Sequence, residues 1–247
     1  MWELKTIEDS YVAFLDILGF KDLVDKNSHL DLQTIFSNDI MHNINRTKKM
    51  MDDVNSELGM PSAIQVLSVS DSIIMWTEGT SPVQFVNIVN AAFSALLFFM
   101  QRGAPLRGAI SKGPVTVHES ENQKNIFGKG ITNAYNLENI QQWSGAVIDD
   151  ICLTEEIVAS SEYEILRRKH ILVEYLVPFK TGPVEYRHAI NWAGLDGRIF
   201  YGDYDAIEKQ FARHNKSIDD WSVKQKIDHT AAFARFVQSL PKDRVTG

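Results

Sequence analysis

The sequence predicts an α+β fold of the ferredoxin-like, or split βαβ, kind, with an antiparallel sheet flanked by helices. One observation is the order of the elements predicted over residues 11–118, which is strand, helix, strand, strand, helix, strand. Another is the composition of the 247-residue chain, which is 44% hydrophobic and 23% charged, as in ordinary globular proteins. A chain of this length forms one large domain, or one domain with an appendage.

The first strand is predicted at residues 11–18, YVAFLDIL, because this run is rich in strand formers and carries a single charge, Asp16. Residues 21–58 are polar with spaced apolar positions, which indicates one or two amphipathic helices. Residues 63–69 and 72–76 both favour strands and flank a Ser-Asp dipeptide. Because Ser and Asp favour turns, the two runs predict a hairpin.

The second helix of the pattern is predicted to begin at Ser81-Pro82, with the proline in its first turn, and to run to about residue 102. Two further strands are predicted at residues 106–111 and 115–118. They are separated by Gly113-Pro114, a pair that is typical of a break in regular structure. The first of these two strands completes the split βαβ pattern.

The rest of the chain is predicted to add more helices and strands to this unit. The predicted elements are a loop at 127–130, a helix at 131–142, a strand at 145–148, a helix near 154–168, strands near 171–176 and 184–192, and helices near 203–213 and 217–239. No change of composition marks a linker between domains. We expect a core over residues 8–150 and a C-terminal α/β extension over residues 151–247, packed on the same domain.

The charge of the chain argues against nucleic acid as a partner. The formal net charge is 25 − 32 = −7 with histidine neutral. An acidic chain is poorly suited to a phosphate backbone, so we expect neither DNA nor RNA. A small phosphorylated ligand stays compatible with this charge, because divalent cations can offset it locally.

Cysteine content and hydropathy predict a cytoplasmic protein without a membrane span. Cys152 is the single cysteine, which rules out an internal disulfide framework and a cysteine-rich zinc site. The first ten residues, MWELKTIEDS, contain no apolar signal core. The longest apolar run, residues 91–100, is too short to span a bilayer and predicts a buried helix.

Asp16 and Asp71 are the candidate metal ligands. An acid inside an apolar strand costs desolvation free energy unless it is paired or binds a metal, although Asp16 alone also fits a cap for the turn at Gly19. Asp71 alone fits an ordinary turn aspartate. In a split βαβ sheet the first strand lies beside the hairpin, so the two carboxylates can face each other. Such a pair can bridge two divalent cations about 4 Å apart, and oxygen ligands favour magnesium or manganese.

Four motifs resemble those of the class III nucleotidyl cyclases. Residues 14–20, FLDILGF, resemble the F-x-D-I-x-G-F signature, and Asp71 falls where that family has its second metal-binding aspartate. Residues 106–113, LRGAISKG, resemble the R-x-G-I-x-x-G strand and turn. Residues 127–138, FGKGITNAYNLE, resemble the Y-F-G-x-x-V-N-x-A-x-R-L-E helix entry. Together the matches span about residues 11–148.

The resemblance implies that residues 8–150 form a class III cyclase catalytic core, which is a phosphorus-oxygen lyase. Asp16, Asp71 and the backbone carbonyl of Ile17 would then bind two Mn²⁺ or Mg²⁺ ions. One ion would lower the effective pKa of the ribose 3′-hydroxyl, and the other would hold the triphosphate. The family builds its sites between two subunits, which implies a two-fold homodimer.

The sequence also departs from the purine cyclases of this family. The lysine and aspartate with which those enzymes read the base align with Leu67 and Asn125, and their transition-state Asn and Arg align with Thr132 and Asn136. One explanation is an inactive, nucleotide-sensing cyclase fold. The other is a different base, with phosphate contacts supplied from elsewhere in the protein. Retention of both metal aspartates favours the second explanation.

The sequence most closely resembles the bacterial pyrimidine cyclases of anti-phage (Pycsar) defence, of the uridylate cyclase type. That resemblance implies UTP or CTP as substrate, cyclic UMP as the second messenger, and a separate effector protein that binds the cyclic product. Cytidylate cyclase, purine cyclase and inactive sensor stay open as alternatives. The sequence lacks the motif of the GGDEF dinucleotide synthases, which share the fold.

Further candidate substrate contacts each have a structural alternative. Phe20 fits a base-stacking residue or a core anchor. Lys129 and the adjacent glycine amides fit a phosphate site at a helix start or an ordinary turn. Arg107 fits a phosphate contact across a dimer or a structural ion pair. Asn125 can both donate to and accept from a pyrimidine edge, whereas Leu67 can do neither.

Overall fold

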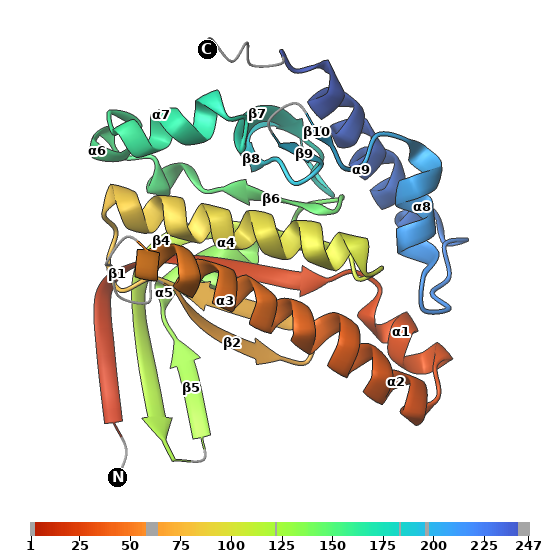
Figure 1. The fold of residues 1–247 in the computed structure, drawn as a ribbon, viewed down its shortest axis with the longest axis horizontal. Coiled ribbons are helices and arrows are strands. Elements are labelled where there is room, and N and C mark those ends of the chain that lie inside the picture. Colours follow the sequence, from red (N-terminus) through yellow and green to blue (C-terminus); the bar gives the residue numbers. More distant parts are fainter. Residues whose placement is uncertain (1–2, 58–63, 122, 183, 196–197, 242–247) are drawn as a thin grey trace.

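A mixed sheet forms the centre of the protein and carries helices on both faces (Figure 1). The computed structural model describes residues 3–57, 64–121, 123–182, 184–195 and 198–241. Residue 58, with which the predicted helical stretch ends, and Ala63, with which the predicted hairpin begins, lie outside these described residues.

The elements of the first half are β1 (Glu3–Ile17), α1 (Phe20–Lys26), α2 (His29–Ile35), the π-helical turn η1 (Phe36–Met41), α3 (His42–Glu57), β2 (Gln65–Val69), β3 (Ser72–Trp76), α4 (Pro82–Gln101), β4 (Leu106–Ser120) and β5 (Gln123–Phe127). Those of the second half are α5 (Lys129–Asn139), β6 (Gly145–Ile148), the 3-10 turn η2 (Asp150–Cys152), α6 (Glu155–Val158), α7 (Ser161–Arg168), β7 (Leu172–Val177), β8 (Glu185–Ile190), β9 (Gly194–Leu195), β10 (Arg198–Ile199), α8 (Tyr204–Ala212) and α9 (Trp221–Ser239).

The strand order confirms the predicted split βαβ fold. The sheet runs β2-β3-β1-β4-β6-β8-β7, with β5 paired to the far part of β4. Its first four strands, β2-β3-β1-β4, are antiparallel neighbours in the order that the split βαβ pattern requires. The sheet is mixed rather than purely antiparallel, because β6 runs parallel to β4. The strands β9 and β10 form a separate two-stranded ribbon.

Two strands are longer than the sequence pattern predicted. β1 begins at Glu3, whereas the predicted strand began at residue 11. The first half of β1 is exposed and polar, so no apolar pattern marked it as a strand. β4 is one strand rather than the two predicted, and Gly113-Pro114 does not end it. The register of β1 against β4 shifts between Ile7 and Ser10, opposite this dipeptide. A proline is tolerated at such a bulge, since no ladder hydrogen bond is required there. The polar strand β5, which returns beside β4, was not predicted.

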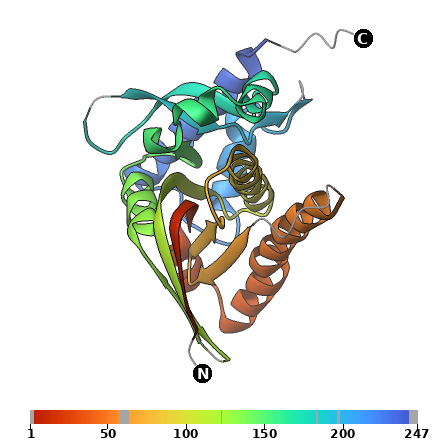
Figure 2. The same cartoon turned by 90° about the vertical axis from the view of Figure 1, so that its left-hand side faces the viewer.

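The two faces of β1 belong to two apolar clusters. Tyr11, Ala13, Leu15 and Ile17 pack in the large core that contains α4. Val12 and Phe14 pack on the other face, in a smaller cluster with Ala134 of α5. Figure 2 shows α5 on one side of β1 and β4, and α3 and α4 on the other. Because strand side chains alternate, Asp16 lies on the same face of the strand as Val12 and Phe14.

The helix α4 forms as predicted, with Pro82 in its first turn and a capping box between Ser81 and Gln84. It is long and apolar enough to cross a membrane by length and composition alone. However, 67% of its most apolar window is buried inside the structure. The helix therefore packs as a core helix, as the sequence predicted.

Residues after 150 join the same sheet and cover one end of it. β8 pairs with β6, and β7 pairs with β8. The single helix predicted near residues 154–168 is two helices, because α6 ends at Val158 and the Ser160 hydroxyl accepts from the Tyr163 amide to cap a new helix, α7. The polar stretch after β1 contains α1 and then α2, η1 and α3 as one helical run.

Candidate functional site

A cleft of about 440 Å³ opens where β1 ends, which is an ordinary size for a small-molecule site. The end of β1, the start of α1, the β2–β3 turn and β4 form one part of its wall. The segment from α8 into α9 forms the other part. Five of the residues proposed from sequence line this cleft, namely Asp16, Ile17, Phe20, Asp71 and Arg107.

Strand pairing brings the two aspartates together. Asp16 is paired with Ser72 in the register of β1 against β3, so Asp71 lies one residue beyond the pair. The amide of Ile17 donates to the backbone carbonyl of Asp71 over 3.0 Å. Ser70 adopts a left-handed backbone conformation, with φ of 57°, and closes the β2–β3 turn. The hairpin predicted from sequence therefore forms and holds Asp71 against the end of β1.

The surroundings of Asp16 disfavour the ionised form of its carboxylate. Its pKa is raised from 3.8 to about 7, chiefly by burial and also by the negative charges of Glu138 and Asp71. The positive charges of Arg107 and Lys180 oppose this increase. A cation bound at this point would favour the ionised form of Asp16.

The donors at this end of β1 fit a hard divalent cation, provided that a ligand completes its coordination shell. Carboxylate and backbone carbonyl oxygens are the donors that magnesium and manganese prefer. The described part of the chain contains no group of three or more His, Cys, Asp or Glu side chains placed to hold a metal ion. Oxygens from a bound phosphate group would have to supply the remaining ligands.

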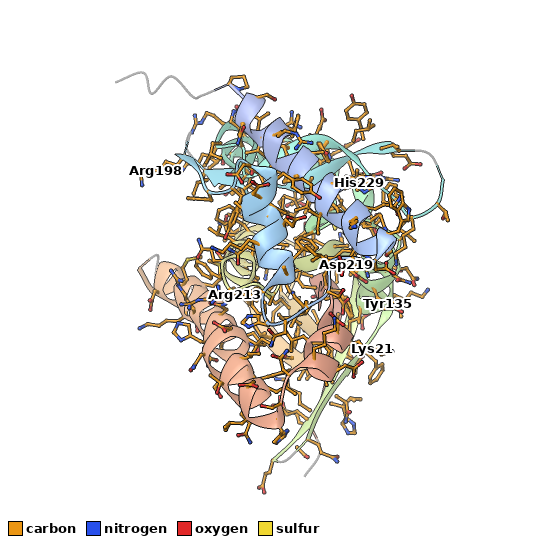
Figure 3. All side chains as sticks on the ribbon, turned by 90° about the vertical axis from the view of Figure 1, so that its right-hand side faces the viewer. Lys21, Tyr135, Arg198, Arg213, Asp219 and His229 are labelled. Atoms are coloured by element: carbon orange, nitrogen blue, oxygen red, sulfur yellow. The ribbon has the colours of Figure 1, made fainter. Side chains whose placement is uncertain are left out.

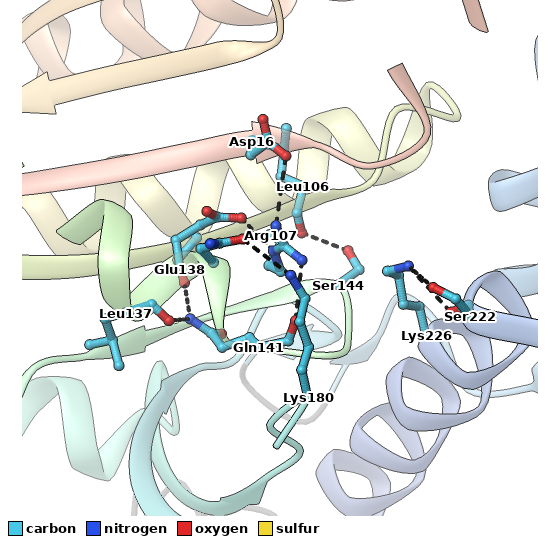
Figure 4. A network of polar contacts seen from close by, with 12 residues as sticks. Asp16, Leu106, Arg107, Leu137, Glu138, Gln141, Ser144, Lys180, Ser222 and Lys226 are labelled. Atoms are coloured by element: carbon cyan, nitrogen blue, oxygen red, sulfur yellow. Dashed lines mark hydrogen bonds and ion pairs between the residues drawn. The ribbon is translucent and has the colours of Figure 1, made fainter. Parts of the chain in front are cut away.

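Arg107 connects β4 to α5 beneath the cleft (Figure 4). Its Nε donates to the Glu138 carboxylate, and its Nη1 donates to the Gln141 carbonyl over 3.2 Å. Its Nη2 lies 3.9 Å from an Asp16 carboxylate oxygen. Glu138 is 2% exposed, and its burial raises its pKa, although Arg107 opposes this increase. Arg107 therefore forms a structural ion pair and also faces the cleft.

Gln141 fixes the end of α5 on the sheet and thereby positions Glu138. Its amide nitrogen donates to the Gly108 carbonyl over 2.9 Å and to the Leu137 carbonyl over 2.8 Å. Its side-chain oxygen accepts from the Trp143 indole over 2.7 Å. All polar atoms of this buried side chain are thus bonded, which holds the Arg107 and Glu138 pair in one arrangement.

Phe20 lies at the mouth of the cleft and also contacts the core. It is the first residue of α1, and its ring meets that of Phe36 edge to face at 5.8 Å. Gly19 precedes it with φ of 75°, a left-handed conformation that glycine adopts without strain. Both roles proposed for Phe20 from sequence are therefore compatible with its position.

The remaining residues proposed to read the base lie outside this cleft. Leu67 on β2 is paired with Ile74 and packs in the small cluster on the α5 face. Asn125 is exposed on β5, next to Ile126, which packs in that same cluster. Since neighbouring strand residues point to opposite faces, Asn125 points away from the cluster that contains Leu67. In one chain these two side chains do not meet.

The phosphate contacts proposed on α5 also lie outside the cleft. Lys129, Thr132 and Asn136 are exposed. The Thr132 hydroxyl donates to the Lys129 carbonyl of its own helix over 3.1 Å. The approach of α5 to β4 is close, because a side chain at Gly130 would lie 3.0 Å from the Gly113 carbonyl. These three side chains are exposed and do not line the cleft of their own chain.

Four lysines near the cleft were not predicted, and one of them, Lys21, is exposed on α1 directly after Phe20 and lines the cleft. Lys180 follows β7, and its amine donates to Asn139 over 3.1 Å. Lys226 is on α9 and lines the cleft. Lys216 also lines it, but this side chain is buried and donates to the Gly103 carbonyl over 2.8 Å. Burial lowers the pKa of Lys216 from 10.5 to about 7.

Lys180, Lys216 and Lys226 come from segments distant in sequence from the aspartates. The backbone amide of Ser217 donates to the carboxylate of Asp22, which ties the segment before α9 to α1. Figure 3 faces this side of the molecule, with Asp219 labelled just before α9 and Lys21 labelled on α1. No local pattern marks a lone lysine as a neighbour of a distant strand, so only tertiary structure reveals these positions.

No protein-family model matches the chain, and no curated protein sequence matches it either. A similar solved structure is the catalytic core of a rhodopsin-guanylyl cyclase with converted specificity in complex with ATPalphaS, which is 18% identical. The match covers 76% of this chain and 98% of that chain, with a TM-score of 0.46. The monomeric guanylyl cyclase domain of the RhoGC fusion protein from the aquatic fungus Blastocladiella emersonii is 15% identical. That match covers 76% of this chain and 97% of that chain, with a TM-score of 0.43.

A third similar structure is a class III adenylyl cyclase-like ATP-binding protein from Pseudomonas aeruginosa. It is 13% identical, and the match covers 60% of this chain and 34% of that chain, with a TM-score of 0.40. These similar structures are thus two nucleotidyl cyclase domains and a cyclase-like nucleotide-binding protein.

Proposed function

We propose that this chain is a metal-dependent nucleotide cyclase that converts UTP to 3′,5′-cyclic UMP and pyrophosphate. The observation that carries the proposal is the pairing of Asp16 and Asp71 at the mouth of one cleft, where β1 meets the β2–β3 turn. The motif in which Asp16 lies resembles the metal-binding signature of the class III cyclases.

In this proposal Asp16, Asp71 and the Ile17 carbonyl hold two Mn²⁺ or Mg²⁺ ions, which when bound supply the positive charge that acidifies the 3′-hydroxyl and neutralises the phosphates. The 3′-oxygen forms a bond to the α-phosphorus as the bond to pyrophosphate breaks, and the hydroxyl proton passes to solvent. Arg107, held by Glu138, keeps a fixed positive charge at the cleft wall. Such a preorganised charge stabilises a developing anion at little reorganisation cost.

The choice of base rests on Leu67 and Asn125. Leu67 has no hydrogen-bonding group with which to read a purine edge, and Asn125 offers both a donor and an acceptor. We infer UTP as the best substrate and CTP as the second. A purine cyclase with altered base contacts is the competing enzyme.

A homodimer would complete the site under this proposal. The side chains of Leu67, Asn125, Thr132 and Asn136 do not line the cleft of their own chain, and the last three are exposed. A two-fold partner could bring them to the cleft of the other subunit. Light scattering gives the mass in solution directly, and a strictly monomeric protein with full activity would contradict the dimer.

The biological setting of the proposal rests on the sequence motifs. We infer a cytoplasmic enzyme of antiviral (phage) defence whose cyclic product activates a separate effector protein. Mass spectrometry of nucleotides extracted from phage-infected cells that carry the protein tests this role. Cyclic UMP should rise only when Asp16 and Asp71 are intact.

The turnover test uses purified protein, manganese and each of the labelled triphosphates ATP, GTP, CTP and UTP. Cyclic UMP is the expected main product. The replacement of the family's asparagine and arginine by Thr132 and Asn136 favours one rival, an inactive nucleotide-sensing module. That rival would bind a triphosphate in equilibrium dialysis and form no cyclic product, whereas the enzyme forms it.

A further inference from the structure

The helix α9 carries a lysine into the cleft that none of the cyclase-like motifs assigns. Lys226 lines the cleft together with Asp16, Asp71 and Arg107. The motif resemblance ends near residue 148, so Lys226 belongs to the C-terminal extension. The extension therefore contributes a cationic side chain to the cleft of the same chain that holds the two aspartates.

The position of Lys226 is fixed by the packing of its helix. Asp220, Val223 and Lys226 follow at intervals of three residues, and all three line the cleft. The next residue, Ile227, is fully buried. One turn further on, the Thr230 hydroxyl accepts from the Ser144 amide over 2.8 Å, which ties α9 to the strand layer. The packing of α9 therefore fixes Lys226 at the cleft wall.

The amine of Lys226 has no anionic partner in the described part of the chain. It donates to the Ser222 hydroxyl over 2.7 Å and to the Ser222 carbonyl over 3.3 Å, both one turn back on its own helix. An ammonium group has three donors, and these neutral acceptors do not balance its charge. Lys226 is only partly exposed, so water screens this charge incompletely.

Positive charges are concentrated around this amine. Burial lowers the pKa of Lys226, and the positive charges of Arg107 and Lys180 lower it further, while Asp220 opposes them. Figure 4 shows Lys180 next to Arg107, with Lys226 on the neighbouring helix. Like charges held together in this way favour a ligand that carries several negative charges.

We propose that Lys226 binds the phosphate chain of the nucleoside triphosphate, with its amine moving from Ser222 to a phosphate oxygen. This inference rests on the proposed function, because it assigns a cation to the substrate of that same site. A phosphate chain can bind to both walls of the cleft. Divalent cations held by Asp16 and Asp71 would bind it at one wall, and Lys226 would bind it at the other. Lys216 is the weaker candidate for this role, because its side chain is buried whereas that of Lys226 is partly exposed.

The binding test uses inorganic tripolyphosphate with manganese, titrated into the full-length protein by calorimetry. This probe lacks a base, so the result does not depend on the uridine proposal. We expect Lys226→Met to weaken binding about tenfold, which corresponds to about 1.4 kcal/mol. The matched control is Lys224→Met, since Lys224 is exposed on the same helix and does not line the cleft. The control should bind as the wild type does.

Two further variants separate the charge from the packing of α9. Lys226→Gln keeps a polar side chain near Ser222 and loses the charge, so it should lose affinity to the same extent as Lys226→Met. Ser222→Ala removes the nearer of the two resting acceptors, the hydroxyl, and keeps the charge of Lys226, so its affinity should equal or exceed that of the wild type. Thermal melting of each variant confirms that it is folded before it is titrated.

The outcomes distinguish this inference from the proposed function. If the wild type binds tripolyphosphate and both Lys226 variants bind it equally well, the role of Lys226 is wrong and the cyclase proposal stands. A tenfold loss in Ser222→Ala or in Lys224→Met would also overturn the role of Lys226. If the wild type neither binds tripolyphosphate nor turns over any of the four triphosphates, the proposed function fails and the inference fails with it.

Discussion

Asp16 and Arg107 face each other across β1 and β4, yet the guanidinium bonds more closely to Glu138 than to Asp16. The Arg107 Nη2 and the Asp16 carboxylate are 3.9 Å apart, which is an ion pair without a short hydrogen bond. Glu138 thus takes the closer contact, and Arg107 offsets the charge of Asp16 only in part. The ionised form of Asp16 therefore stays disfavoured, and a bound divalent cation would stabilise it.

Asp16→Asn and Asp71→Asn should each lower turnover by about a hundredfold or more, because several kcal/mol of charge stabilisation depends on these ligands. The fold should survive both changes. Asp16→Asn in particular removes a carboxylate whose ionised form is disfavoured by burial and by two neighbouring carboxylates. Product formation is measured beside thermal melting, and near-normal turnover in either variant would end the two-metal proposal.

Arg107→Met should destabilise the protein by about 3–5 kcal/mol at neutral pH, because it leaves Glu138 buried without its partner. The double variant with Glu138→Gln should cost less than the sum of the two single changes, since no unpaired charge remains. Urea unfolding of the four proteins gives the coupling free energy. Strict additivity would show that the pair contributes no mutual stabilisation.

The free energy of unfolding should depend on pH through Lys216. Its pKa is lowered from 10.5 in the unfolded chain to about 7 in the fold, so folding disfavours the charged form. The penalty is fully present below pH 7 and fades as the pH rises toward 10.5, because the unfolded state then also loses its proton.

Lys216→Met removes this penalty together with one hydrogen bond to Gly103. The melting temperature of Lys216→Met minus that of the wild type should therefore be larger at about pH 6.5 than at about pH 9.5. The exposed Lys224→Met is the control, and its difference should not change with pH. A difference for Lys216→Met that grows with pH would contradict the burial of a disfavoured charge.

The ratio of kcat/KM values for the four triphosphates tests the inference about the base. We expect UTP first, CTP second and both purines poor, because a polar mismatch at a buried edge discriminates more strongly than the about 1–3 kcal/mol available from apolar size. The measurement uses the same manganese concentration throughout. More efficient turnover of ATP or GTP than of both pyrimidines would show that Leu67 and Asn125 were interpreted wrongly.

Local patterns were sufficient to predict the elements around the two aspartates. The strand that ends near Asp16, the hairpin whose turn contains Asp71 and the capped helix after Ser81 all form as expected. Their order also predicted the strand order β4-β1-β3-β2, because the split βαβ pattern leaves little freedom in how these strands pair.

Regions of mixed polarity were harder to predict. The first half of β1 and the whole of β5 are polar ribbons exposed to solvent, so no hydrophobic alternation marks them. Gly113-Pro114 has the composition of a turn, but the dipeptide lies at an irregularity in the pairing of β4 with β1. That pairing is a long-range property which the dipeptide itself does not encode.

The candidate site was predictable only on its β-sheet side. Asp16, Asp71, Arg107 and Phe20 belong to motifs, and the structure brings all four to one cleft, while their chemical roles stay predictions. Lys226 belongs to no motif. It reaches the cleft because α9 and the end of β1 line the same cleft, and periodicity predicts the helix but not its direction.

The order of synthesis has a consequence for the last helix. β6 pairs with β4 on one side, and its other edge stays open until β8 has been made. An unpaired strand edge invites association with other chains. The cleft is completed later still, because α9 begins only at Trp221. A nascent chain therefore holds both aspartates before its sheet has all of its strands and before both walls of the cleft are in place.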